Sequence, residues 1–229
     1  MMREIAEPGH GLWTFQQPLS VLGAEIGVRM TVVRLRDGGL FVHSPIRLTD
    51  AITRALDGLG EVRWVLAPNL DHYLFVLDFQ AKYEGARFCA APGVERKLPG
   101  ALFDVSLRHP SLPDGLGDVL VPAWFRSSHE LEELLLFHPS TRTLITADLA
   151  FNVQSTEGLL SHVMLRLNDS YGSFGPSRVC RSKITERRMA RQDVDAILAL
   201  NPERCIVSHG EILFGGATTA LRDAYAWLR

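Results

Sequence analysis

The chain has 229 residues, 46% hydrophobic and 22% charged, which is the composition of an ordinary globular protein and predicts one domain over residues 1–229. Its formal net charge of −2 gives no general attraction to phosphate backbones or anionic lipid, so the composition argues against nucleic acid and against a membrane surface as partners. No apolar run reaches the roughly 18 residues that span a bilayer, and residues 1–9 lack the apolar segment of a secretory signal.

The first 90 residues alternate between β-rich runs and helical patterns. Val28–Arg34 and Leu40–His43 flank an Asp-Gly-Gly turn at 37–39, and this pattern predicts a hairpin. Thr49 is a favourable cap for a helix, which we expect to end at the Asp-Gly pair 57–58. The other elements predicted in this part are strands at 12–16, 62–67 and 87–90 and a helix at 74–83. The strand-helix-strand order from residue 62 onward is that of a βαβ unit.

The second part of the chain combines a further hairpin with a closing strand and helix. Two β-rich runs at 134–137 and 143–147 predict the hairpin, and residues 152–186, rich in Ser, Gly and Arg, predict an ordered loop with one short helix. The remaining predicted elements are a helix at 193–200, a strand at 205–208 and an amphipathic helix at 217–228. Hairpins mixed with strand-helix units favour an α/β (α+β) fold, with two sheets packed face to face and helices outside, a four-layer αββα sandwich.

Three cysteines are an odd number, and their spacing fits neither a zinc site nor a disulfide framework. A reducing compartment suits them best, so we expect a cytoplasmic protein. Cys89 and Cys205 lie in apolar segments and are expected to be buried. Cys180 has cationic neighbours that would lower the pKa of its thiol, but no paired base is evident, which favours a structural role.

Residues of metal-ligand type follow predicted strands at several places. Asp71 and His72 come after the strand at 62–67, Asp148 follows the second hairpin, His209 follows the last strand, and His129 precedes the second hairpin. Each alone is explained by a turn cap or by an ordinary structural histidine. Together they suit a metal site, because loops at strand ends bring imidazole nitrogens and carboxylate oxygens from distant positions to one ion.

Residues 10–213 resemble the metallo-β-lactamase superfamily, whose fold is an αββα sandwich with a one- or two-metal site at its edge. The family's HxHxDH motif corresponds to Ala-Pro-Asn-Leu-Asp-His at 67–72, which retains only the final Asp-His. The later family motifs correspond to Ser-His-Glu at 128–130, Thr-Ala-Asp at 146–148 and Ser-His-Gly at 208–210. The usual DTG turn is His-Ser-Pro at 43–45. This degenerate pattern is most similar to a branch known as the domain of unknown function 4336 family.

The resemblance implies how the metal ligands divide between two sites. In two-metal members, the first ion uses both histidines of HxH, the hairpin histidine and the bridging aspartate, and here Ala67 and Asn69 replace two of them. We therefore expect the first site to be empty. The second set is complete, and we expect it to bind one zinc or iron ion through Asp71, His72, Asp148 and His209.

The same resemblance assigns supporting roles to other residues. Asp71 and His129 are the implied catalytic residues, with His129 acting as a general acid or base or orienting the substrate, beside water made acidic by the ion. His43 and Asn69 are expected to support the ligands rather than to bind the ion.

Two functions remain compatible with these residues. One is a metal-dependent hydrolase of a small ester, thioester or lactone, with a small molecule as its partner. The other is a metal-free binding or scaffold module, in which an ancestral site has decayed because incomplete ligand shells lose affinity. The chain contains no GxSxG, GxxxxGK[ST] or GxGxxG motif, so no other cofactor is indicated. Dimerisation stays open.

Overall fold

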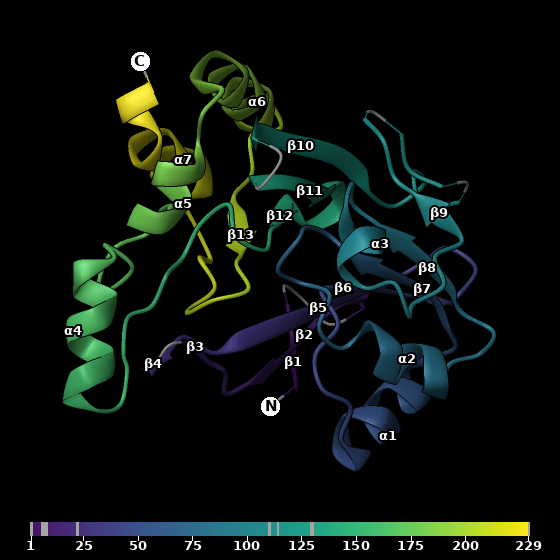
Figure 1. The fold of residues 1–229 in the computed structure, drawn as a ribbon. Coiled ribbons are helices and arrows are strands. Elements are labelled where there is room, and N and C mark those ends of the chain that lie inside the picture. Colours follow the sequence, from purple (N-terminus) through teal and green to yellow (C-terminus); the bar gives the residue numbers. More distant parts are fainter. Residues whose placement is uncertain are drawn as a thin grey trace.

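Two β-sheets lie face to face at the centre of the computed structural model (Figure 1). The structure describes residues 2–5, 9–21, 23–109, 111–113, 115–128 and 131–228. The larger sheet has the strand order β1-β2-β5-β6-β7-β8-β9. Its strands are β1 (Met2–Glu4), β2 (Leu12–Gln17), β5 (Val28–Arg34), β6 (Leu40–His43), β7 (Val62–Ala67), β8 (Arg87–Ala90) and β9 (Val105–Ser106). β6, β7 and β8 are parallel neighbours, as a βαβ unit requires.

The smaller sheet has the order β10-β11-β12-β13, and its last two strands are parallel. Its strands are β10 (Val121–Ser128), β11 (Leu131–His138), β12 (Thr143–Ile145) and β13 (Arg204–Ile206). A separate small hairpin is formed by β3 (Ser20–Val21) and β4 (Ala24–Glu25). The two longer hairpins expected from the sequence, β5–β6 and β11–β12, are confirmed by their antiparallel pairing.

Helices cover the outer faces of both sheets. The larger sheet carries α1 (Asp50–Leu59), α2 (Val76–Lys82) and α3 (Val94–Lys97). The smaller sheet carries α5 (Arg178–Lys183), α6 (Arg187–Ala199) and α7 (Ala217–Ala224), with short 3₁₀ turns η1 (Pro139–Thr141) and η2 (Ala226–Leu228). The remaining helix, α4 (Leu159–Leu167), stands at the periphery beside the β3–β4 hairpin (Figure 1). Across the described part of the chain, no helix combines the length and the apolar character needed to cross a membrane.

The alternation of side chains along the strands builds three apolar layers. In β6, Leu40 and Val42 pack under the helices of the larger sheet, whereas Phe41 faces the smaller sheet. Leu134 and Ile145 of the smaller sheet meet Phe41 in the layer between the sheets. A third layer lies between the smaller sheet and α5–α7. This arrangement confirms the predicted αββα sandwich.

Several element boundaries differ from the sequence-based predictions. Thr49 caps α1 as expected, but the helix continues through Gly58 to Leu59 and closes at Gly60. The extra turn lets Leu59 pack against the core beside the fully buried Leu56, which outweighs the modest cost of a helical glycine. Helix α6 likewise begins six residues before the predicted 193, because Ala190 adds to its buried face.

The elements missed from the sequence include strand β10 and one helix between residues 152 and 186. Strand β10 contains Pro122, which argues against a central strand, but β10 is an edge strand of its sheet, where proline is tolerated. Residues 152–186 contain two helices, α4 and α5, rather than one. The second is capped by Ser177, whose hydroxyl accepts a hydrogen bond from the amide of Cys180.

All three cysteines are buried and free, as expected for Cys89 and Cys205. Burial raises the pKa of each thiol to about 12. For Cys180, the positive charge of Lys183 lowers the pKa of the thiol, but burial outweighs this effect and the net pKa is raised. Arg178 and Arg181 both form ion pairs with Asp169, and desolvation of the thiolate dominates.

Candidate metal centre

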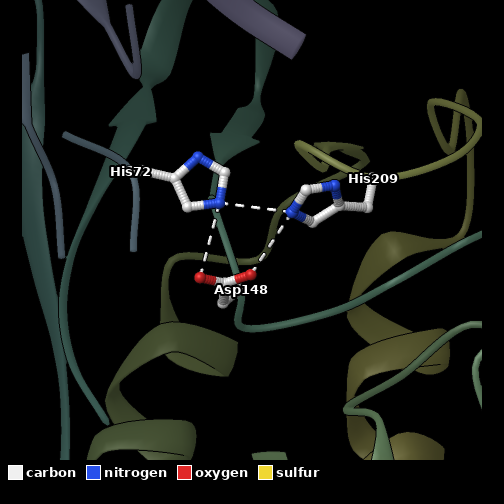
Figure 2. Close-up of side chains that lie close together, drawn as sticks. All are labelled: His72, Asp148 and His209. Atoms are coloured by element: carbon white, nitrogen blue, oxygen red, sulfur yellow. Dashed lines mark hydrogen bonds and ion pairs between the residues drawn. The ribbon is translucent and has the colours of Figure 1, made fainter. Parts of the chain in front are cut away.

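Three buried side chains from distant parts of the chain meet at one point (Figure 2). The Nε2 atoms of His72 and His209 lie 3.3 Å apart. The Nε2 atom of His72 is 3.4 Å from Oδ2 of Asp148, and the Nε2 atom of His209 is 3.5 Å from Oδ1. The carboxylate of Asp148 thus faces both imidazoles, and the structure brings together three of the four ligands expected from the sequence.

Strand topology explains why these residues converge. Asp148 follows β12 and His209 follows β13, and because these strands are parallel neighbours, the residues beyond their carboxyl ends lie side by side. His72 stands in the loop between β7 and α2. The amide of Leu134 in β11 donates to the carbonyl oxygen of Pro68, which ties this loop to the smaller sheet.

The ring of His209 is held by its backbone surroundings. Its Nδ1 atom lies 2.6 Å from the carbonyl oxygen of Gly27, which can only accept, so Nδ1 must donate. In the neutral ring, the lone pair is then on Nε2, which faces His72 and Asp148. The ring of Phe151 stacks on the imidazole at a centroid distance of 5.0 Å and an interplanar angle of 13°. The orientation needed for a metal ligand is therefore set before any ion binds.

The ring of His72 has an analogous partner in Ser44. The hydroxyl of Ser44 lies 2.6 Å from Nδ1 of His72. Ser44 adopts a left-handed backbone conformation, with φ at 57°, and its amide donates to the carbonyl oxygen of Leu66. The His-Ser-Pro turn after β6 departs from the expected DTG. Through Ser44, it supplies a hydroxyl group as the hydrogen-bond partner of the His72 ring.

The charges at this point favour an ion pair. Burial raises the pKa of a carboxyl group, but for Asp148 the attraction of His72 and the close polar contacts with His209 and His72 outweigh it, so the pKa lies well below its usual range. Burial lowers the pKa of His72, but the attraction of Asp148 outweighs it, so the net pKa is raised. Asp148 is therefore an anion that attracts positive charge, whether a proton on His72 or a metal ion.

A fourth buried group, Glu133, was missed by the sequence analysis. Its side chain is fully buried in β11, and its carboxylate accepts hydrogen bonds from the amides of Ala147 (2.7 Å) and Asp148 (2.8 Å). Burial, together with the negative charge of Asp148, raises the pKa of Glu133 to about 7. The sequence contains one signal for this role, because Glu133 stands next to the apolar run of β11. A glutamate is rarely buried unless it has a specific partner.

Asn69 connects this glutamate with the three-residue group. Its side-chain oxygen accepts hydrogen bonds from the amides of Asp71 (3.0 Å) and His72 (2.9 Å). Its Nδ2 atom donates to Oδ2 of Asp148 at 2.8 Å and lies 3.4 Å from Oε2 of Glu133. Asn69 therefore contacts the Asp71–His72 turn through its oxygen and the two buried acidic groups through its nitrogen.

Asp71 lies outside the three-residue group. Its side chain is 53% exposed, and its carboxylate is 3.5 Å from Nζ of Lys97 and 4.0 Å from Nζ of Lys183. The physical reason is desolvation. A third carboxylate beside Asp148 and Glu133 would lose its hydration in a site that already contains two acidic groups, and this costs free energy. The four-ligand set expected from the sequence is thus reduced to three in this arrangement.

The two remaining histidines of the sequence analysis have different outcomes. His129 lies outside the described residues. His43 ends β6 and is buried, and burial together with the charge of His72 lowers its pKa to about 3. Its Nε2 atom has no hydrogen-bond partner among the described residues. His43 is therefore a buried, neutral ring that directly precedes Ser44 in the chain.

The donor set and its spacing fit a single metal ion. Two atoms bound tetrahedrally at about 2.0–2.1 Å from zinc stand about 3.3–3.4 Å apart, and the distances of 3.3, 3.4 and 3.5 Å within the group are close to that value. Two imidazoles and one carboxylate are a set used by catalytic zinc sites and by non-haem iron(II) sites, both of which keep a position open for water or substrate.

Comparison with known proteins identifies a matching family model and solved structures with a similar fold. A family model described as Domain of unknown function (DUF4336) matches residues 9–192. The chain resembles the DIM-1 metallo-β-lactamase exposed to ceftazidime, with 14% identity, coverage of 98% of this chain and 95% of that one, and a TM-score of 0.66. A metallo-β-lactamase from Pontibacter korlensis shows 11% identity, coverage of 98% of this chain and 98% of that one, and a TM-score of 0.67. The metallo-β-lactamase FIM-1 from Pseudomonas aeruginosa in its mono-zinc form shows 13% identity, coverage of 98% of this chain and 92% of that one, and a TM-score of 0.62. No curated protein matches the chain. At these identities the likeness establishes the fold.

Proposed function

The chain belongs to the family described as Domain of unknown function (DUF4336), and we propose that it is a metal-dependent hydrolase with one zinc or iron ion held by His72, Asp148 and His209. The proposed substrate class is a small ester, thioester or lactone. Support comes from the metallo-β-lactamase fold and from a fold neighbour named as a mono-zinc form. The proposal omits Asp71 from the ligands, because its carboxylate pairs with lysines.

The observation that carries the proposal is the orientation of His209. Because Nδ1 donates to Gly27, the neutral ring presents a lone pair to an anionic carboxylate oxygen 3.5 Å away. Two electron-rich atoms facing each other in a buried site repel, unless a proton or a metal ion lies between them. The Nε2 atom of His72 faces the same point. A metal ion satisfies all three groups at once.

The residues of the chain divide the chemistry between them. A bound ion would supply Lewis-acid activation of water and polarisation of a carbonyl oxygen. Asp148 holds negative charge against the ion, while Gly27 and Ser44 hold the two imidazole rings in place. Asp71, which is next to His72 in sequence and half-exposed, is proposed to exchange protons with water and substrate. His129 keeps its proposed acid-base role on the sequence resemblance alone.

A second function is favoured by one specific observation. With a proton on His72 and with no metal, the contact of 3.4 Å between His72 and Asp148 is an ion pair, and Asp71 has its own partners. This arrangement suits a metal-free binding or scaffold module that uses the former site for a ligand. Metal content therefore separates the two proposals.

The test is metal analysis of protein purified without chelators, combined with hydrolysis assays. We expect about one zinc or iron ion per chain, lost in Asp148→Ala and His209→Ala. The control His162→Ala should retain the ion, because His162 lies in α4 and accepts a hydrogen bond from Arg166. Hydrolysis of p-nitrophenyl acetate, a thioester and a lactone should depend on the ion. A wild-type protein without an ion and without turnover, even after zinc or iron(II) is added, would favour the scaffold module.

A further inference from the structure

The amide group of Asn69 lies between two buried carboxylates. Its Nδ2 atom is 2.8 Å from Oδ2 of Asp148 and 3.4 Å from Oε2 of Glu133. Asn69 and Glu133 are 97% and 100% buried, and Asp148 is 93% buried. An amide nitrogen carries two hydrogens, so one group can serve both carboxylates. In a chain that lacks the leading histidines of HxHxDH, a hydrogen-bond donor thus lies beside the face of Asp148 that points to Glu133.

These contacts define which way Asp148 faces. Oδ2 receives the Asn69 amide and faces His72, while Oδ1 faces His209. The backbone amide of Asp148 is fixed at the same time by Glu133. Rotation of the carboxylate away from the two imidazoles would leave the Asn69 amide without its shorter hydrogen bond, and burial makes such a loss costly.

We infer that Asn69 is a positioning residue, which substitutes for a cation between Asp148 and Glu133 and so restricts the centre to one ion. This inference rests on the proposed function and goes beyond it, because it concerns how many ions the chain can hold. Its chemical basis is that two buried carboxylates need either a shared donor or a shared cation. When an anionic side chain replaces the Asn69 amide, this side chain becomes, together with Asp148 and Glu133, the ligand set for a second divalent ion.

The decisive variant is Asn69→Asp. The aspartate retains an oxygen that can accept from the amides of Asp71 and His72, so the turn remains capped. Its second oxygen, however, faces Asp148 and Glu133 in place of a donor. We expect zinc stoichiometry, measured by equilibrium dialysis and elemental analysis, to rise from one ion per chain to two. We also expect the melting temperature without metal to fall below that of the wild type and to recover when zinc is added.

Two control variants separate positioning from capping. Asn69→Ser also caps the turn but is too short to reach Asp148, so it should bind one ion with an affinity reduced by about 10- to 100-fold, the usual effect of losing a group that orients a ligand. The double variant Asn69→Asp with Glu133→Gln should return to one ion, since it removes a carboxylate from the added site.

The outcomes distinguish this inference from the proposed function. A wild-type protein that binds no zinc or iron overturns the proposed function and the inference together. If the wild type binds one ion, and Asn69→Asp also binds one ion with wild-type affinity and wild-type stability without metal, the inference alone is overturned. Two ions in Asn69→Asp that persist after Glu133→Gln would remove Glu133 from the account and overturn it as stated.

Discussion

Gly210 offers a sharp test of how the His209 loop is built, through the substitution Gly210→Ala. Gly210 has φ at 93°, and a Cβ atom there would overlap the carbonyl group of Asn152. The positive φ alone costs about 1–3 kcal/mol for a residue with a side chain. Relief of the overlap requires separation of two segments joined by hydrogen bonds from the amide of Asn152 to His209 (3.0 Å) and from the amide of Glu211 to Asn152 (2.7 Å). These bonds contribute about 1 kcal/mol each.

The total is therefore about 3–5 kcal/mol, which corresponds to a fall in melting temperature of about 10 °C for a chain of this size. Because His209 precedes Gly210, the metal affinity should fall as well. The assay is thermal unfolding with and without zinc, and the matched control is Gly215→Ala, where a Cβ would meet nothing within 4 Å. If Gly210→Ala has the melting temperature and zinc affinity of the wild type, the proposed packing of this loop is refuted.

Three further perturbations test other parts of the structure. Ser44→Ala should weaken metal binding by about 10- to 100-fold, because His72 loses the partner of its Nδ1 atom; zinc titration checks this, and unchanged affinity would contradict it. Asp193→Ala should lower the free energy of unfolding by about 2–4 kcal/mol in urea, since Asp193 accepts hydrogen bonds from the amide and guanidinium of Arg126; a change below about 1 kcal/mol would contradict this. Cys180 should not react with a thiol reagent at pH 8 in the folded protein, because burial raises the pKa of its thiol to about 12; rapid labelling before unfolding would show that the site is open.

The fold was predictable because its signals are local. The Asp-Gly-Gly turn at 37–39 between two β-rich runs requires no tertiary information, and the structure confirms the hairpin. Strand β10 was missed because the preference of proline against strands is overridden at a sheet edge. Helix α1 ran past Gly58 because burial of Leu59 is a tertiary gain that helix propensity does not contain.

The candidate site was predictable in part for the same reason. His72, Asp148 and His209 follow strands, and parallel pairing of β12 with β13 makes the ends of these strands neighbours. The direction of the Asp71 side chain depends on two lysines from other elements. Lys97 lies in α3, 26 residues away in sequence, and Lys183 lies in α5. The role of Glu133 depends on the amides of Ala147 and Asp148. No spacing rule within the sequence contains such contacts.

The most direct test of a one-ion centre is anomalous X-ray diffraction from crystals of protein purified without chelators, collected at the absorption edge of the metal found by fluorescence. The proposal predicts one anomalous peak, about 2.0–2.2 Å from Nε2 of His72, Nε2 of His209 and an oxygen of Asp148, with the Asn69 amide still bonded to Asp148. Crystals with no peak among these three side chains, even after soaking in zinc or iron(II), would contradict it.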